Sequence, residues 1–240
     1  MASYHFEIKS GGKGAAAEHA KYILREGKYS GRGDLLATGC GNMPEWAEAN
    51  SAVFWRAADQ FERTNGATYR EMVTTLPNEL DTDQNVELAR RLIEGLAGEK
   101  PYQYAIHAPD AKLGEEANTH LHLMISDRLP DGIKRSPEMT FKRSNPTHPE
   151  RGGCKKDSGG KSPLELRDDV IAKRKRVASI TNMMLAENGF DVRVDHRSHR
   201  ERGIERQPER HLGQARIRNM SAQEKAEYVA VRANNQDETT

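Results

Sequence analysis

Three histidines on two predicted strands have the spacing of a metal site. Along residues 118–126, His120 and His122 alternate with leucine and isoleucine, so on a β-strand both imidazoles lie on one face. Residues 103–107 read as a second strand that ends in His107, and the segment between has the Pro, Asp and Gly of a loop. If the strands are neighbours, three imidazoles meet at one corner, which predicts a metal site with positions left open for substrate.

A tyrosine and a glutamate lie earlier in the chain. Tyr22 follows His19 by one turn of an alanine-rich predicted helix. An aromatic residue in such a helix is usually a packing residue of the core, and Tyr22 would have another role only if it faced the three histidines. Glu71 falls inside a predicted strand, an unfavourable place for a carboxylate that has no partner. His-x-His alone also occurs as ordinary polar surface, so the chemistry depends on these residues meeting.

The elements that must position these residues alternate between strands and helices. Residues 4–9 alternate as a half-buried strand, and residues 15–26 form a helix that stops at Gly27. Residues 30–50 read as an irregular excursion, followed by a helix over 51–64, a strand over 69–76 and a helix capped by Asp81 or Thr82. This order predicts an α+β fold, in which helices cover a small central antiparallel sheet.

The second half is predicted to be looser and more basic. A Gly/Pro/Lys-rich stretch at about 143–163 predicts a flexible loop. A long helix over 164–188, a last strand over 190–195, a basic segment over 196–211 and a final helix from Ser221 follow. Residues 131–218 carry 21 Lys and Arg against 13 Asp and Glu, whereas residues 1–130 carry 14 against 19. A basic second half next to a predicted metal site suggests that the protein binds a polyanion.

Composition narrows the class of protein. The 240 residues suit one large domain, or one domain with an appendage. They contain no apolar run long enough to span a bilayer and no signal-peptide pattern at the N-terminus. Cys40 and Cys154 lie in glycine-rich segments expected to be exposed, without the spacing of metal ligands. We expect a cytoplasmic protein without disulfides.

Several motifs together resemble the MobA/MobL-type (MobQ class) relaxases of mobilisable plasmids. They are the Tyr22 segment Ala-Lys-Tyr-Ile-Leu-Arg-Glu-Gly-Lys-Tyr, the strand that begins Tyr-Arg-Glu at residue 69, and the block Asn-x-His-x-His-Leu-Met-Ile-Ser-x-Arg at 118–128. Asp-Gly-Ile at 131, Phe-Lys-Arg at 141, Asp-His-Arg-Ser at 195, Arg-Gly-Ile-Glu-Arg at 202 and His-Leu-Gly at 211 follow in order. The similarity runs from about residue 2 to residue 213.

The resemblance implies an HUH-endonuclease fold and a strand-specific DNA nicking and rejoining activity at a plasmid origin of transfer. By that resemblance Tyr22 is the nucleophile that becomes joined to the 5′ phosphate, and Glu71 is the acidic residue near the site. His107, His120 and His122 are the ligands of a divalent metal, Mn²⁺ or Mg²⁺. The implied relaxase domain spans residues 1–213. A C-terminal helix and tail follow at 214–240, as part of a basic, helical C-terminal region. Tyr29 is a distant second candidate for the nucleophile.

DNA at the origin, single-stranded near the nick and partly duplex, is the implied partner, together with accessory mobilisation proteins and a coupling protein of a secretion system. The basic half supplies the candidate DNA contacts, because Lys and Arg dominate binding to phosphates. These candidates are Lys134, Arg135, Lys142, Arg143, Arg193, Arg197 and Arg206.

Three other functions remain open. A rolling-circle replication initiator uses the same chemistry but usually has its tyrosine after the histidines, whereas Tyr22 precedes them. A DNA-binding module with a structural metal, and without catalysis, is the second. A metal hydrolase of small molecules is disfavoured, because it would leave the basic half without a role.

Overall fold

The computed structural model describes residues 4–110, 117–205, 212 and 214–237. The chain divides into two compact units, Met1–Pro109 with Thr119–His196, and Asp110–Asn118 with Arg197–Thr240. The predicted DNA-contacting residue Arg206 lies outside the described residues. The predicted boundary at residue 213 stays a prediction.

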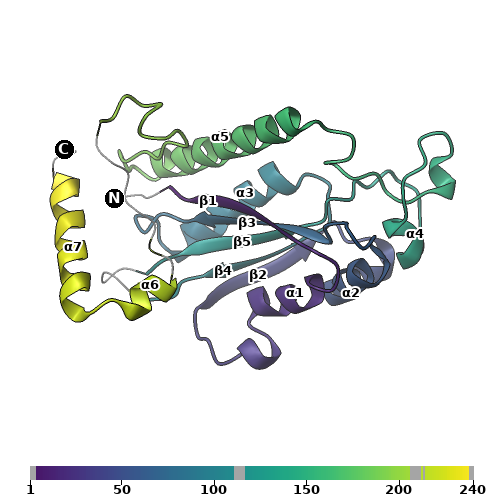
Figure 1. The fold of residues 1–240 in the computed structure, drawn as a ribbon, viewed down its shortest axis with the longest axis horizontal. Coiled ribbons are helices and arrows are strands. Elements are labelled where there is room, and N and C mark those ends of the chain that lie inside the picture. The colour runs from purple at the N-terminus through teal and green to yellow at the C-terminus, as the bar shows by residue number, and fades with distance from the viewer. Residues whose placement is uncertain (1–3, 111–116, 206–211, 213, 238–240) are drawn as a thin grey trace. The chain divides into compact units, whose positions relative to one another are not determined.

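The first unit is built on a five-stranded antiparallel sheet. Its strands are β1 (Phe6–Gly11), β2 (Leu35–Gly41), β3 (Tyr69–Thr75), β4 (Tyr102–His107) and β5 (His120–Ile125). They lie in the order β1-β3-β5-β4-β2, so β5 occupies the centre (Figure 1). β4 and β5 are neighbours, with His107 opposite His120. The predicted adjacency of the two histidine strands is therefore confirmed.

Helices cover both faces of the sheet (Figure 1). One face packs against α3 (Thr82–Ala97) and α5 (Pro163–Glu187). The other packs against α1 (Ala16–Leu24) and α2 (Ser51–Phe61), and α4 (Pro137–Phe141) packs against α2. Short 3₁₀ turns lie at Gly27–Tyr29, Glu45–Ala47 and Pro149–Arg151. The predicted α+β arrangement is the observed one.

The alternation of side chains along β5 places the histidines on the α1 side of the sheet. Leu121, Leu123 and Ile125 are buried in the core shared with α3 and α5. Met124, on the opposite face, belongs to the core shared with α1 and α2. His120 and His122 have the same parity as Met124, so their imidazoles face the layer that contains α1.

The segment over residues 30–50 corrects the sequence prediction. Residues Leu35–Gly41 of this segment, which was predicted to be irregular, form the edge strand β2, which pairs with β4 and has one register shift between Leu35 and Ala37. Its two glycines lie where a side chain would collide, since a Cβ on Gly39 would come 2.6 Å from the Tyr104 ring and one on Gly41 2.5 Å from the Tyr102 hydroxyl. The glycines that made this segment look like a loop in the sequence are therefore the residues that allow the strand to pair with β4.

Residues 190–195 also differ from the prediction, because they form no strand. Val194 is buried, and its backbone is satisfied by a side chain. The Asn182 amide donates to the Val194 carbonyl and accepts from its N–H, both at 2.8 Å. Asn182 thus replaces the partner strand that the alternating pattern had predicted.

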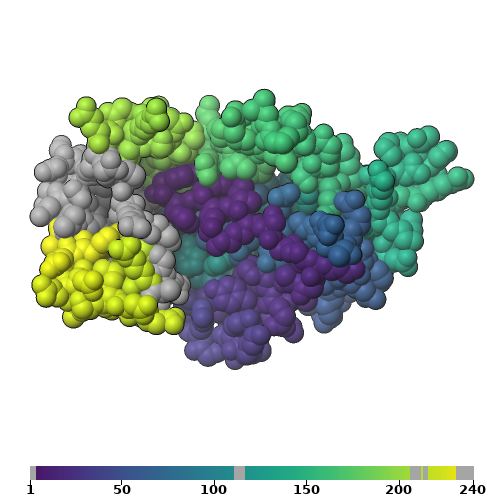
Figure 2. Space-filling model, in the orientation of Figure 1, coloured from purple at the N-terminus to yellow at the C-terminus, as the bar shows by residue number. Residues whose placement is uncertain are grey.

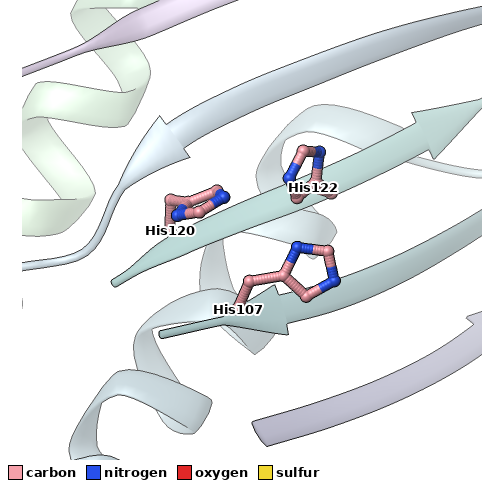
Figure 3. Close-up of side chains that lie close together, drawn as sticks. All are labelled: His107, His120 and His122. Carbon is pink, nitrogen blue, oxygen red and sulfur yellow. The ribbon is translucent and has the colours of Figure 1, made fainter. Parts of the chain in front are cut away.

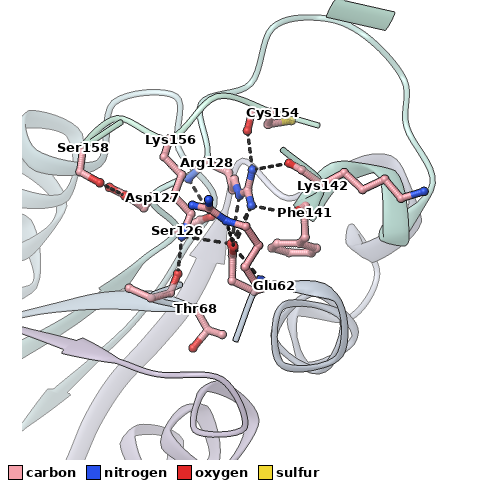
Figure 4. A network of polar contacts seen from close by, with 12 residues as sticks. Glu62, Thr68, Ser126, Asp127, Arg128, Phe141, Lys142, Cys154, Lys156 and Ser158 are labelled. Atoms are coloured by element: carbon pink, nitrogen blue, oxygen red, sulfur yellow. Dashed lines mark hydrogen bonds and ion pairs between the residues drawn. The ribbon is translucent and has the colours of Figure 1, made fainter. Parts of the chain in front are cut away.

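A buried ion cluster fixes the chain that follows β5 (Figure 4). Arg128 donates to both carboxylate oxygens of Glu62, at 3.0 and 2.8 Å, and to the carbonyls of Phe141, Lys142 and Cys154. Lys156 lies 3.1 Å from the same carboxylate. This cluster holds the chain just before the segment predicted to be a flexible loop, at residues 141 and 142, and again within that segment, at residues 154 and 156. Cys154 is buried there, contrary to the expectation from its glycine-rich surroundings, whereas Cys40 is exposed.

The second unit contains α6 (Gln214–Asn219) and α7 (Ala222–Asp237). α7 begins where predicted, because Ser221 Oγ accepts from Glu224 N and the Glu224 carboxylate accepts from Ser221 N. Asp110 and Ala117 form an isolated antiparallel bridge. Among the described helices, none has the length and hydropathy needed to cross a bilayer.

Candidate active site

The three predicted metal ligands meet at the end of β4 and the start of β5 (Figure 3). Their ring centroids lie 4.6 Å apart for His107 and His122, 4.8 Å for His120 and His122, and 5.6 Å for His107 and His120. One nitrogen from each ring lies within 4.8 Å of the others. This is the only such cluster of potential ligands in the part of the chain that the structure describes.

Glu71 is oriented by two histidines. Its Oε1 accepts a 2.7 Å hydrogen bond from Nδ1 of His122. His19 Nε2 lies 2.9 Å from the same oxygen, without the alignment of a hydrogen bond. Burial raises the pKa of Glu71, but the contacts with His122 and His19 outweigh burial and lower it to about 2. A carboxylate is thus held ionised behind one predicted metal ligand, an arrangement typical of histidines that bind metals.

His107 is wholly buried, and both its ring nitrogens have partners. Nε2 lies 2.7 Å from the Ile23 carbonyl and Nδ1 lies 3.0 Å from Nη2 of Arg25. A guanidinium can only donate, so Nδ1 carries the lone pair and Nε2 carries the proton. Burial is the main cause that lowers the pKa of His107 to about 4, which keeps this imidazole neutral and able to bind a metal.

Tyr22 projects from the last turn of α1 toward this cluster. Its ring centroid lies 6.3 Å from that of His122, with the two rings perpendicular, and 5.8 Å from that of His19. The ring is half-buried. The N-terminal part of the chain, which includes α1, is exposed on the face of the molecule shown in Figure 2, where it is coloured purple. Tyr29 is also close, since its ring packs edge-on against Tyr22 at 5.3 Å.

The structure brings the predicted catalytic and metal-binding residues together, and it describes six of the seven predicted DNA contacts, five in the first unit and one in the second. Lys134, Lys142 and Arg143 follow β5, beyond the end of the strand opposite to His120. Arg193 and Arg197 are exposed, Arg197 in the second unit. Arg135 is different, because its side chain is 3% exposed and its guanidinium binds Asp131 and the carbonyls of Pro149 and Gly152.

Several residues of the site were missed from the sequence. Arg25 and Asp34 form a buried ion pair beside His107, and Tyr69 stacks on His19 at 4.8 Å. Only His19 had a readable signal, because it lies three residues before Tyr22 on one face of a helix. Asp34 lay in the segment predicted to be irregular, so nothing in the sequence connected it to Arg25.

The antiparallel sheet with a His-x-His strand at its centre, a third histidine on the adjacent strand and helices on both faces agrees with the fold that the family resemblance implies. A solved structure described as the molecular basis of vancomycin resistance transfer in Staphylococcus aureus is similar, with a TM-score of 0.61 and 25% identity. The match covers 82% of this chain and 100% of that one.

The chain belongs to the MobA/MobL family, whose model matches residues 19–223. It is 42% identical over 210 residues to a 43 kDa relaxation protein of Salmonella typhimurium, covering 86% of this chain and 57% of that protein. It is also 42% identical over 220 residues to mobilization protein A of Escherichia coli, covering 89% of this chain and 30% of that protein. The chain therefore spans about half the length of the first relative and less of the second.

Proposed function

We propose that this chain nicks and rejoins one DNA strand at a plasmid origin of transfer, through a covalent phosphotyrosyl intermediate on Tyr22. The observation that carries the proposal is the placement of the Tyr22 ring 6.3 Å from His122, beside the only cluster of potential metal ligands among the described residues. Membership of the MobA/MobL family supports the same reaction and substrate.

The residues present fit a divalent metal. The three imidazoles offer nitrogens within 4.8 Å of one another, and His107 is neutral by virtue of its burial. The Glu71 carboxylate accepts from Nδ1 of His122, which leaves the lone pair of that ring on Nε2, where it would be available to a metal ion. A bound ion, Mn²⁺ or Mg²⁺ by family resemblance, supplies charge to neutralise the scissile phosphate.

The chain's own residues account for the other parts of the reaction. The Tyr22 hydroxyl gives up its proton to solvent water and its oxygen forms a bond to phosphorus. The bond from phosphorus to the 3′ oxygen breaks, and the 3′ oxygen takes up a proton from solvent water, so the step has no net change in protons. The 5′ phosphate is then esterified to Tyr22. Resealing reverses these exchanges and needs no nucleotide, because the phosphotyrosyl ester retains the energy of the broken bond.

Glu71 serves as the residue that orients His122 rather than as the base. Its pKa of about 2 makes it a weak proton acceptor near neutral pH, because a general base works best when its pKa lies near the operating pH. The orienting role needs only the ionised carboxylate, which the two histidine contacts maintain.

Exposed cations supply the DNA contacts in this proposal. Lys134, Lys142, Arg143, Arg193 and Arg197 are retained because they are exposed. Arg135 is omitted because its side chain is buried and its guanidinium binds Asp131 and backbone carbonyls. The DNA is single-stranded near the nick and duplex beside it. Accessory mobilisation proteins and a coupling protein of a secretion system complete the proposed set of partners.

A nicking assay on a whole plasmid tests the proposal and does not require the origin sequence to be identified first. The purified chain is incubated with Mn²⁺ and a supercoiled plasmid that carries the DNA flanking its coding sequence. We expect conversion to open circles with one 5′ end blocked by protein, and no blocked end with Tyr22→Phe. Tyr29→Phe, which changes the neighbouring ring, is the matched control and should form the adduct. An adduct that persists in Tyr22→Phe would refute the assignment.

A further inference from the structure

Arg25 joins the proposed nucleophile to a proposed metal ligand. Its Nη1 donates to the Tyr22 carbonyl at 3.0 Å, and its guanidinium lies 5.0 Å from the centre of the Tyr22 ring. Nη2 donates to Nδ1 of His107 at 3.0 Å. Asp34 holds this guanidinium through two 2.8 Å bonds, to Nε and Nη2. One buried cation thus contacts the end of α1 and the end of β4.

The backbone conformation at Arg25 indicates that an arginine is present at this position because of the contacts of its side chain. Arg25 ends α1 in the left-handed region, at φ 58° and ψ 37°, where glycine is the usual residue and other residues are disfavoured. Strain of this kind persists where surrounding contacts fix it. Here those contacts are made by the guanidinium with Asp34, His107 and Tyr22.

The contact with His107 falls on the nitrogen that a metal would need. A metal-binding histidine usually donates its other ring N–H to a carbonyl or carboxylate. In His107 that role belongs to Nε2, which lies 2.7 Å from the Ile23 carbonyl. The remaining lone pair, on Nδ1, already accepts from Arg25. A metal ion and the guanidinium are therefore alternative partners of one buried lone pair.

We propose that Arg25 is a positioning residue, which fixes Tyr22 and holds the Nδ1 lone pair of His107 until it yields that lone pair to the metal ion. The inference rests on the proposed function, because it assumes a metal at the three histidines. After the exchange, Arg25 keeps Asp34 and the Tyr22 carbonyl as partners, so the nucleophile stays anchored.

The proposal predicts two effects of opposite sign when the guanidinium is removed. Metal affinity rises, because the competitor for Nδ1 is gone and a cation no longer lies beside the ion. Nicking slows, because Tyr22 loses the group that fixes its carbonyl and its ring. A merely structural role for Arg25 would lower both quantities together.

Two variants separate this effect from changes in fold and charge. Arg25→Gly suits the left-handed backbone, so α1 should end where it does now. It leaves the Asp34 carboxylate unpaired, and that negative charge would by itself attract a metal. The double variant Arg25→Gly/Asp34→Asn removes the ion pair without changing the net charge. Arg32→Gln is the control. The Arg32 guanidinium lies 5.7 Å from the centre of the same Tyr22 ring, but it does not hydrogen-bond to His107.

Mn²⁺ binding to the DNA-free protein is measured by electron paramagnetic resonance titration, with thermal melts to verify folding. We expect the double variant to bind Mn²⁺ at least about threefold more tightly than wild type, and Arg32→Gln to bind as wild type does. At saturating Mn²⁺, nicking by the double variant should be slower by about tenfold. Unchanged or weaker Mn²⁺ binding in the folded double variant, or unchanged nicking, would overturn the proposal.

The same titration distinguishes failure of this inference from failure of the proposed function. Wild type that binds no Mn²⁺, or binds it equally well after His120→Ala, refutes the metal site itself, and the role of Arg25 with it. Wild type that binds Mn²⁺ through His120, combined with a double variant that does not bind more tightly, refutes only the role of Arg25.

Discussion

At the scale of single residues, Glu71 shows how a strand can tolerate a buried carboxylate. The sequence predicted that this residue needs a partner, and the structure supplies His122 and His19 on the same carboxylate oxygen. The partners come from β5 and α1, separated from Glu71 by about 50 residues on each side of the chain. Local sequence therefore predicts the need for a partner but not its identity.

Replacing Glu71 should weaken metal binding. Glu71→Gln keeps the shape but offers His122 only a neutral acceptor, so the ring loses its charged anchor. Loss of such an anchor typically costs 10- to 100-fold in metal affinity, and we expect a loss in that range by calorimetric titration with Mn²⁺. Glu7→Gln, on edge strand β1 with Lys9 as its partner, is the control. A Glu71→Gln protein that binds Mn²⁺ like wild type would show that Glu71 orients nothing.

The residue scale also shows where sequence reasoning stopped. His107, His120, His122, Tyr22 and Glu71 were predicted by alternation and by family resemblance, and the structure gathers them. Arg25 was not predicted, because an arginine after an alanine-rich helix resembles any exposed helix end. Its importance depends on a left-handed backbone and on Asp34, and neither leaves a mark in the local pattern.

At the scale of elements, the helices with an apolar stripe were predicted well, whereas one strand was missed and one predicted strand was wrong. The helices α3 and α5 begin at capping boxes, with Asp81 and Ser162 as N-caps, and each has an apolar stripe that packs on the sheet. β2 was missed because its glycines serve close packing against tyrosine rings. Residues 190–195 were predicted as a strand because an alternating pattern reports burial on one side, and Asn182 provides the backbone bonds instead.

The Glu62–Arg128 pair links the end of α2 to the chain after β5, so its loss should destabilise the fold. Glu62→Gln leaves the buried Arg128 guanidinium without its carboxylate partner, and breaking such a pair costs about 3–5 kcal/mol. Urea unfolding at pH 7 measures this difference from wild type. Glu94→Gln, an exposed carboxylate on α3, should cost little. A loss below about 1 kcal/mol for Glu62→Gln would contradict the anchoring role.

The Glu62–Arg128 pair should also make the free energy of unfolding depend on pH in the acid range. Burial raises the pKa of Glu62, but the hydrogen bonds from Arg128 and the charge of Lys156 outweigh burial, so the net shift is downward from 4.5. A carboxylate with a lowered pKa stabilises the fold above its unfolded pKa, and loses this effect as pH falls through its folded pKa. The stability gap between wild type and Glu62→Gln should therefore narrow below about pH 4.5. A gap that is constant from pH 7 to pH 3 would contradict this.

At the scale of the whole molecule, net charge conceals an uneven distribution. The chain carries 37 Lys and Arg against 36 Asp and Glu, yet residues 131–218 hold 21 of the cations and 13 of the anions. Arg143 is exposed in this basic half. The proposed DNA contacts rest on this asymmetry, because surface cations lower the free energy of phosphate binding by releasing counterions.

The salt dependence of DNA binding tests that asymmetry. If Arg143 contacts a phosphate, Arg143→Ala should reduce the slope of log Kd against log salt by about 0.7–0.9. Fluorescence anisotropy with a labelled origin fragment, identified in the nicking assay, measures it between about 50 and 200 mM salt. Arg90→Ala removes an exposed cation of α3 that already pairs with Glu87 and should leave the slope unchanged. Equal slopes for wild type and Arg143→Ala would exclude Arg143 from the interface.

The strand order has a consequence for how the two halves of the site move. β5 is hydrogen-bonded on both sides, to β3 and to β4, so the amides of His120–Ile125 should exchange with heavy water among the slowest in the protein. Tyr22 lies on α1, a nine-residue helix that ends two residues after it. At the proposed site, backbone fluctuations should therefore be larger at Tyr22 than at His120 and His122 of β5.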